Sequence, residues 1–352
     1  MKVLCAMSGG VDSSVAAAEL VAAGHEVVGV TMRLWGGDSD TGCCSIADVD
    51  DARRVTQQLG IDHLVFNFTD EFDHHVVDPY VAAHAAGITP NPCIECNRHL
   101  KFARLTDRAD LLGFDAVATG HHARIVDVAG SSRVARGADA AKDQSYVVHM
   151  LAQRELARTV FPVGHLTKAD VRARAAELGL RTAEKPDSQD VCFITHAAGR
   201  AQFLGERIPF RRATVVDEDG QRLGEVPAVE LVTIGQRRGI GLPGGGAKRY
   251  VIDVRAGDDP MVVVGAEGDL ADRSLWVDRL EWAADPLEAP TDVMVQCSAH
   301  GEPRPAVYDS GVVVWHEPQR RVSPGQSVVL YDVTNTWVHG GGIATRSLVN
   351  RP

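Results

Sequence analysis

Long hydrophobic runs are missing from this sequence of 352 residues. Although 45% of the residues are hydrophobic, no apolar stretch is long enough to span a bilayer. Met1-Lys2 leads straight into a strand-like segment, without the charged and then apolar leader of a secreted protein. Internal repeats and low-complexity tracts are absent too. We therefore expect a cytoplasmic protein of two or three globular domains, with no membrane partner.

The number of cysteines is also not even. The chain has seven cysteines, and an odd number without a leader argues against a disulfide-bonded scaffold. The same count favours reactive or metal-binding thiols.

Positive charge is scarce. The formal net charge of −11 argues mildly against a nucleic-acid partner. The distribution softens this, because residues 196–250 contain nine Lys or Arg against six Asp or Glu. Only six of the 36 basic residues are lysines. Genome base composition can produce such a bias, so we attach no function to it.

The most informative segment is Ser8-Gly9-Gly10-Val11-Asp12-Ser13-Ser14, which follows the apolar run Val3–Met7 and opens the helical stretch Asp12–Ala23. It matches neither GxxxxGK followed by Ser or Thr nor GxGxxG. Two glycines between a strand and a helix let backbone N–H groups and the helix N-terminus converge on one point, which suits a pyrophosphate. Ser and Asp side chains can cap the helix, bind phosphate or hold magnesium. The alternative is an ordinary strand-to-helix turn.

Strands and helices alternate in the first half of the chain. Short apolar segments predict parallel strands at Val3–Met7, His25–Met32, His63–Asn67 and Asp115–Thr119. Helical spacing, each time followed by a glycine, predicts helices at Asp12–Ala23, Ser45–Leu59, Asp70–Ala86 and Cys96–Leu112. This alternation is typical of a doubly wound, mainly parallel α/β sheet of the Rossmann-like type, which binds ligands beyond the carboxyl ends of its strands.

The pattern changes to short strands after about residue 200. We predict a hairpin from Ala213–Val216 and Arg222–Val226, then strands at Tyr250–Arg255 and Met261–Gly265. From Asp269 onward, short strands with Pro and Gly turns indicate a small barrel or sandwich. We expect three domains: an α/β domain at 1–198, a small β-rich domain at 199–268 and a C-terminal β-barrel at 269–352.

Two cysteines with Cys-x-x-Cys spacing, Cys93 and Cys96, lie in the Pro-rich segment Thr89–Asn97. The helix expected after them would lower a thiol pKa and make the thiol more reactive. Two buried core cysteines, or a zinc site that uses His99, are the alternatives. Cys192 joins this pair only if the fold brings it close.

Three polar segments have weaker signals. Cys43-Cys44-Ser45 suits a helix cap better than a second reactive site. Lys142–Tyr146 precedes an expected apolar helix, and it is either a solvated helix start or part of a site. Gly235–Gly239 is a basic loop that suits phosphate backbone about as well as it suits a hairpin tip.

Together these motifs resemble those of the bacterial tRNA-specific 2-thiouridylases, which belong to the PP-loop ATP pyrophosphatases. The resemblance extends from residue 2 to the end region of the chain and is carried, in order, by Ser8–Ser13, Met32 with Trp35, Cys43-Cys44-Ser45, Thr89–Asn97, Lys101-Phe102, Ala118–His121, Lys142–Tyr146, Phe161–Gly164, Asp187–Gln189, Cys192-Phe193, Thr233–Arg237 and Gly340–Ile343.

The resemblance implies an ATP-dependent enzyme that thiolates the wobble uridine of tRNAs for Lys, Glu and Gln. ATP with Mg²⁺ adenylates the uracil C2 oxygen, and a cysteine persulfide, charged by a cysteine desulfurase or sulfur-relay protein, replaces AMP by sulfur. By position, Cys96 matches the nucleophile and Cys192 the persulfide carrier. The residues that match ATP contacts are Ala6, Met7, Ser8, Gly9, Gly10, Val11, Asp12, Ser13, Met32 and Gly120. Asn91, Pro92 and Cys93 match the target-base loop, and the matches to tRNA contacts are His121, Lys142, Asp143, Gln144 and Gln326.

The chain departs from the family pattern at several positions. Many relatives have Asp in place of Cys93, and a thiol there makes Cys93, Cys96 and Cys192 an alternative ligand set for a 4Fe–4S cluster. We favour the persulfide relay, which needs only Cys96 and Cys192. His122 replaces a common Tyr, and Ser298-Ala299 stand where relatives often have Arg-Tyr.

Two other classes remain open from the residues. A PP-loop ligase or amidotransferase would adenylate oxygen but attack with an amine, and it would not need the three cysteines. A nucleotide-sensing or redox-regulatory module would not be an enzyme at all.

Overall fold

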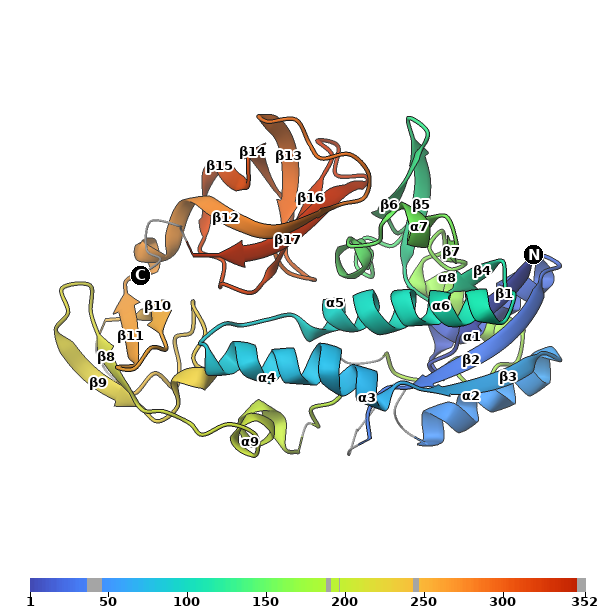
Figure 1. Ribbon diagram of the computed structural model, residues 1–352, viewed down its shortest axis with the longest axis horizontal. Helices are drawn as coiled ribbons and strands as arrows, with labels where there is room; N and C mark the ends of the chain where they lie inside the picture. Colours follow the sequence, from blue (N-terminus) through green and yellow to red (C-terminus); the bar gives the residue numbers. More distant parts are fainter. Residues whose placement is uncertain (37–45, 188–190, 196, 243–246, 347–352) are drawn as a thin grey trace.

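The computed structural model describes residues 1–36, 46–187, 191–195, 197–242 and 247–346 (Figure 1). Its first unit is built on a five-stranded sheet with the order β3-β2-β1-β4-β7. Every neighbouring pair in this sheet is parallel. The strands are β1 (Lys2–Ala6), β2 (Glu26–Arg33), β3 (Asp62–Asn67), β4 (Ala116–Ala118) and β7 (Thr159–Val160). The doubly wound α/β fold is thus confirmed. The first four predicted strands begin and end within one residue of their predicted bounds.

Alternate residues of β1 divide the core into two layers, because successive side chains of a strand point to opposite faces. Val3 and Cys5 pack under α1 (Val11–Ala22), α2 (Ile46–Leu59) and α8 (Lys168–Glu177). Leu4 and Ala6 face the other layer, which is made by the chain from 69 to 85 and from 92 to 111.

The second layer consists of two long helical segments, each interrupted by π-helical turns. The first contains α3 (Thr69–Phe72), a π-helical stretch at Asp73–Val77 and α4 (Asp78–Ala85). The second contains α5 (Pro92–Cys96), a π-helical stretch at Asn97–Arg104 and α6 (Leu105–Leu111).

The start of the second segment corrects our prediction. The helix begins at Pro92, four residues before the expected Cys96. Asn91 is its N-cap, and its side-chain oxygen accepts a hydrogen bond from the Cys93 backbone N–H at 3.1 Å. Pro92 suits the first helical position because its ring fixes φ and it has no N–H to satisfy. Cys93 and Cys96 therefore lie inside the helix, not before it.

Between β4 and β7 along the chain, residues 123–136 form a hairpin of β5 (Ala123–Val128) and β6 (Ser131–Arg136). We did not predict this hairpin from the sequence. The expected apolar helix after Lys142–Tyr146 is only a short 3₁₀ turn at Ser145–Val148, and the side chains of Ser145 and Tyr146 are hydrogen-bonded to the barrel. Two further short helices are α7 (Gln153–Leu156) and α9 (Gly199–Gly205).

Two β units complete the molecule (Figure 1). The smaller is a sheet of β10 (Tyr250–Arg255), β11 (Met261–Gly265), β8 (Ala213–Val216) and β9 (Arg222–Val226), in that order, and all four strands match the prediction. The larger is a closed barrel with the order β12-β15-β14-β13-β16-β17. Its strands are β12 (Ala271–Trp282), β13 (Thr291–Gln296), β14 (Arg304–Asp309), β15 (Val312–Arg320), β16 (Ser327–Tyr331) and β17 (Val338–Thr345).

Within the part of the chain that the structure describes, no helix combines the length and the apolar content needed to cross a bilayer. Cys43, Cys44 and Ser45 lie outside the described residues, as do Ser188 and Gln189.

Candidate functional site

The glycine-rich loop connects β1 to α1 at the carboxyl edge of the sheet. Gly9 has φ +73°, and a Cβ atom there would lie 2.3 Å from the Asp48 carbonyl oxygen. A Cβ on Gly120, which follows β4, would lie 2.6 Å from the Ser13 backbone nitrogen. Only glycine permits these approaches. The N-cap of α1 is Gly10, which has no side chain to cap the helix, so the N-terminal N–H groups can bind an anion.

Serine hydroxyls hold this loop in shape. The Ser13 hydroxyl accepts a hydrogen bond from the Ser8 backbone N–H at 3.2 Å and donates to the Gly10 carbonyl at 3.1 Å. Ser14 donates to the same carbonyl at 2.8 Å. The loop is thus preorganised by its own side chains, as a phosphate cradle needs to be.

Asp12, in the first turn of α1, lies between two hydrogen-bonding partners, Lys168 and His122. Its carboxylate is 2.7 Å from the Lys168 ammonium through either oxygen, and 3.0 Å from His122 Nε2. Burial favours the protonated form, but the hydrogen bonds from His122 and Lys168 outweigh it and hold the pKa of Asp12 below its usual range. Asp12 is therefore a carboxylate at neutral pH, which suits a residue that holds a metal ion or orients a cation.

Lys185 holds the loop from another direction. Its ammonium donates to the Gly9 carbonyl at 2.9 Å and pairs with Asp48 and Asp51 near the start of α2. Burial lowers the pKa of Lys185, but these two carboxylates reverse the effect and raise it overall.

A third lysine, Lys142, pairs with Asp187 at 2.8 Å. Lys168 reaches the other oxygen of the same carboxylate at 2.9 Å. Burial raises the pKa of Asp187, but the hydrogen bonds from the two lysines dominate and hold it well below its usual range.

Three of the chain's six lysines thus belong to the ion-pair networks of this loop and Asp187, in a protein whose basic residues are mostly arginines. Sequence reasoning placed Lys142 in a candidate site but missed Lys168 and Lys185. The scarcity of lysine, to which we attached no function, was the signal that could have found them.

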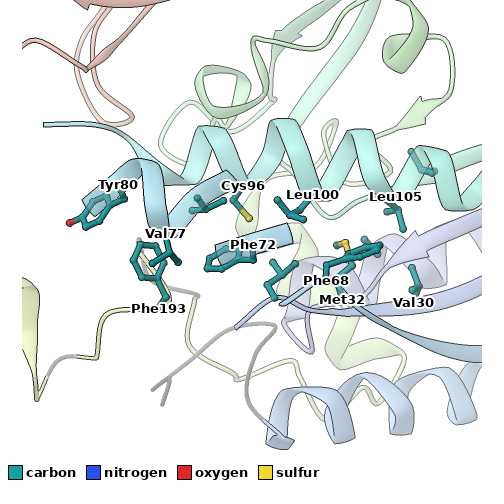
Figure 2. Packing of buried hydrophobic residues seen from close by; sticks show 14 of the residues in the cluster. Val30, Met32, Phe68, Phe72, Val77, Tyr80, Cys96, Leu100, Leu105 and Phe193 are labelled. Carbon is teal, nitrogen blue, oxygen red and sulfur yellow. The ribbon is translucent and has the colours of Figure 1, made fainter. Parts of the chain in front are cut away.

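One cysteine of the predicted sulfur chemistry, Cys96, lies in the second core layer. Cys96 is 7% exposed and belongs to the same apolar cluster as Ala6 and Met32, which end β1 and β2. Figure 2 shows the Cys96 side chain pointing from its helix into this cluster. One apolar cluster therefore includes both Ala6, at the end of the strand that enters the glycine-rich loop, and Cys96.

The segment that contains Cys192 is anchored in the same cluster by its neighbours. Phe193 is buried, and its ring lies 5.6 Å from that of Phe72 and 5.5 Å from that of Tyr80, between ring centroids (Figure 2). Burial raises the pKa of the Tyr80 hydroxyl, and an electrostatic interaction with Cys93 acts in the same direction. The fold thus gathers Cys93, Cys96 and the neighbours of Cys192 around one aromatic cluster.

The barrel is hydrogen-bonded to the loop that leads to Cys93 and packs closely against it. The Gln326 side chain donates to the Thr89 carbonyl, and the Thr89 N–H donates to the Pro324 carbonyl at 3.0 Å. Gly325, with φ +92°, packs so closely that a Cβ would lie 2.3 Å from Ile88. The predicted contact residue Gln326 and the predicted target-base loop Asn91–Cys93 therefore lie near each other, although they are distant in sequence.

The other predicted tRNA contacts have internal partners. Asp143 binds Arg136 at 2.7 Å, and the Gln144 side chain accepts from the His122 N–H at 2.8 Å. His121 is buried against Thr119, and desolvation lowers the pKa of its imidazole to about 3. Arg237 and Arg238, in contrast, are exposed and have no ion pair among the residues that the structure describes.

No three His, Cys, Asp or Glu side chains converge as metal ligands within the described residues. The set Cys93, Cys96 and Cys192 therefore does not form a preassembled cluster site in this arrangement, and we derive no step through one.

The parallel sheet, its glycine-rich loop with clustered lysines and the two β units that follow define a PP-loop nucleotide-binding α/β protein. Family models agree with each unit. The tRNA methyl transferase HUP domain matches residues 1–196, the tRNA methyl transferase PRC-barrel domain matches 201–265, and the aminomethyltransferase β-barrel domain matches 272–344.

The chain belongs to the family of tRNA-specific 2-thiouridylases. It is 46% identical to the tRNA-specific 2-thiouridylase MnmA of Mycobacteroides abscessus, over 98% of this chain and 100% of that protein. For MnmA of Chloroflexus aggregans the identity is 45%, over 98% of each chain. For MnmA of Mycobacterium tuberculosis it is 47%, over 94% of this chain and 92% of that protein.

Similarity to solved structures is more distant. The U34-tRNA thiolase NcsA from Methanococcus maripaludis is 17% identical, with a TM-score of 0.36 over 58% of this chain and 63% of that chain. NMN synthetase from Francisella tularensis is also 17% identical, with a TM-score of 0.33 over 53% of this chain and 66% of that chain.

Proposed function

We propose that this protein is a cytoplasmic enzyme that uses ATP to convert the wobble uridine of tRNAs for Lys, Glu and Gln to 2-thiouridine. The observation that carries the proposal is the continuity of the site. A single apolar cluster joins the ends of β1 and β2, beside the glycine-rich loop, to Cys96 and to Phe193, the neighbour of Cys192. An activation site and a sulfur-transfer site that are held by one rigid core are what thiolation of an activated base requires.

In the first step, the uracil C2 oxygen attacks the α-phosphorus of ATP, and the bond to pyrophosphate breaks. The loop from Ala6 to Ser13, with Met32 and Gly120, binds the nucleotide. The loop fits a pyrophosphate because its glycines leave room for close approach and the N-terminus of α1 has no side-chain cap. Asp12 and Ser13 are the residues that would hold Mg²⁺, which supplies charge neutralisation on the phosphates.

In the second step, sulfur replaces oxygen. The terminal sulfur of a persulfide on Cys192 attacks C2, and AMP leaves with the C–O electron pair. The Cys96 thiolate then attacks the Cys192 sulfur, which releases 2-thiouridine and leaves a Cys96–Cys192 disulfide. A thiol reductant restores both cysteines, and a cysteine desulfurase or relay protein recharges Cys192.

In this proposal, the three structural units have different roles. The unit at 1–198 performs the chemistry, while those at 199–268 and 269–352 hold the anticodon arm, because a wobble base must be splayed from its loop to reach the site. Asn91, Pro92 and Cys93 receive the base. His121, Lys142, Asp143, Gln144 and Gln326 contact the tRNA directly or shape the surface that does.

The test is mass spectrometry of tRNA from a strain depleted of this protein. Loss of 2-thiouridine, restored by the wild-type gene but not by Cys96→Ser or Cys192→Ser, is the expected result. Cys297→Ala, which alters a free thiol in the barrel, is the matched control and should restore the modification. Unchanged 2-thiouridine in the depleted strain would refute the proposal.

Anaerobic purification with iron and sulfide analysis separates the relay from the iron–sulfur alternative. In the relay, Cys93→Asp retains activity without iron. If a stoichiometric 4Fe–4S cluster restores turnover to apo-protein, and substitution of Cys93, Cys96 or Cys192 by Ala destroys it, the cluster mechanism replaces the relay.

A further inference from the structure

The single carboxylate of Asp187 has three positively charged partners. Lys142, Lys168 and Arg172 all approach its carboxylate, at 2.8, 2.9 and 2.9 Å. One of these cations, Lys168, is shared with Asp12 in the glycine-rich loop, at 2.7 Å. The ammonium of Lys168 is therefore a bridge between the expected phosphate cradle and Asp187.

The position of Lys168 suits it to bind a phosphate group. Its side chain is only 12% exposed, so its charge is weakly screened, and it contacts the first turn of α1, where backbone N–H groups face an anion. Lys142 lies on the same side and is 44% exposed. A polyphosphate carries more negative charge and more acceptor oxygens than one carboxylate, so it competes well for both ammonium groups.

We propose that Lys168 and Lys142 are phosphate-binding residues of the activation step, and that Asp187 is the internal anion which the nucleotide's phosphates displace from them. The inference rests on the proposed use of ATP. It assigns the two lysines a shared role: they exchange a carboxylate partner for a phosphate partner when the nucleotide binds.

A purely structural ion-pair network explains less of the geometry. Arg172 anchors this stretch of chain, since its guanidinium also donates to the carbonyls of Ala183 and Lys185 at 2.8 and 3.1 Å. Lys185 adds a second anchor through Gly9, Asp48 and Asp51. The two lysines are therefore not needed to hold Asp187 in place, and they can change partner without loss of the local fold.

The experiment measures the affinity of a non-hydrolysable ATP analogue, with Mg²⁺ and without tRNA, by calorimetry. Lys168→Met should weaken binding at least tenfold and Lys142→Met severalfold. Asp187→Asn should strengthen binding severalfold, because it removes the competitor. The triple variant Lys142→Met/Lys168→Met/Asp187→Asn should bind no more tightly than Lys142→Met/Lys168→Met, since the benefit of removing Asp187 acts through these two lysines.

Two controls make the result specific. Adenosine, which has no phosphates, should bind all variants alike, and Arg174→Met, on the same helix but paired with Glu19, should leave analogue affinity unchanged. Unchanged affinity in Lys168→Met or Lys142→Met, or unchanged or weaker affinity in a folded Asp187→Asn, overturns the inference. If the wild-type protein binds no nucleotide at all, the proposed function fails instead.

Discussion

Charge around the glycine-rich loop is balanced residue by residue. Asp12 pairs with Lys168 and His122, while Lys185 pairs with Asp48 and Asp51. A loop with such internal partners is stable without a ligand, yet each partner is also a group that a magnesium–phosphate complex attracts. The same contacts therefore explain both the stability of the loop and its suitability for phosphate.

The first prediction at this scale concerns Asp12. Asp12→Ala should reduce tRNA-dependent pyrophosphate release at least a hundredfold, because a carboxylate that orients the metal or its cationic neighbour is lost. The protein should remain folded, since Lys168 keeps Asp187 as a partner. Pyrophosphate release and a thermal melt measure the two effects, and undiminished release would remove the assignment of this loop to ATP activation.

Buried histidines give the second residue-scale prediction. Desolvation lowers the pKa of His121 to about 3 and those of His84 and His149 to about 4. Because an unfolded histidine has a pKa of about 6.5, the unfolded state binds more protons as the pH falls below that value. Each histidine should therefore cost up to about 1.4 kcal/mol of stability per pH unit between roughly pH 6.5 and 4.

Urea unfolding at pH 7.5, 6.5 and 5.5 checks this. Stability should decline steeply below pH 6.5, and His149→Gln should make the decline shallower. His165, which is exposed, is the control, and His165→Gln should leave the slope as it is. A stability that is flat between pH 7.5 and 5.5 would contradict the prediction.

At the scale of elements, turns from separate units shape the site. The barrel turn at Pro324–Gln326 is hydrogen-bonded to Thr89, three residues before Pro92 begins the helix of Cys93 and Cys96. π-Helical turns adjoin this helix, and Asn97 in one of them donates to the Val147 carbonyl at 2.8 Å. Such turns widen a helix locally and are frequent at functional sites.

Gly325 tests whether the barrel positions the target-base loop. Gly325→Ala should place a methyl group against Ile88 and lower tRNA-dependent pyrophosphate release at least tenfold, with no change in affinity for an ATP analogue. Gly311→Ala is a matched control, because Gly311 has nearly the same φ, +91°, but no crowded neighbour. Equal activity of the two variants would show that the turn does not position the loop.

The exposed loop containing Arg237 and Arg238 tests the contact with tRNA. If both guanidinium groups bind phosphates, Arg237→Ala/Arg238→Ala should flatten the salt dependence of tRNA affinity by roughly one to two units of log–log slope. Arg212 and Arg222 are exposed arginines of the same small domain that pair with Glu225, and their double replacement by Ala should not change the slope. Equal slopes for the wild type and the Arg237/Arg238 variant would mean that this loop does not contact phosphate.

For the whole molecule, Arg136 joins the α/β domain to the barrel. From the end of β6, its guanidinium binds Asp143 and the barrel residue Gln296, both at 2.7 Å, and Asn335 at 2.6 Å. It also lies 3.6 Å from the centre of the Tyr331 ring. One planar cation, whose side chain is 17% exposed, thus satisfies acceptors from both units and fixes their relative position.

Arg136→Met should therefore lower the free energy of unfolding by about 3 kcal/mol or more, because Asp143 is left as a buried, unpaired charge. Adding Asp143→Asn should recover part of that loss. Arg154→Met removes an exposed ion pair with Asp107 and Asp110 and should change stability by less than about 1 kcal/mol. Denaturant unfolding measures all three, and a loss in Arg136→Met no larger than in Arg154→Met would contradict this role.

The sequence by itself determined the first four strands of the parallel sheet, the strands of the small β domain and the nature of the first loop. Strand and helix periods are local, so the predicted strands of the sheet, the hairpin of β8 and β9, and β10 and β11 all appear where expected. The glycines of the segment Ser8–Ser14 likewise indicate that its backbone needs unusual φ/ψ angles and close approach. These features depend on neighbouring residues, which a sequence shows directly.

Only the tertiary structure decided which distant residues share the site. Lys168 and Lys185 reach the loop across more than 150 residues of chain, and Gln326 reaches Thr89 across more than 200. The hairpin of β5 and β6 also escaped prediction, because most of its residues are neither fully buried nor fully exposed and so show little periodicity. Ion pairs and close packing depend on distance in space, and that distance is set by how the sheet, the small β domain and the barrel pack together.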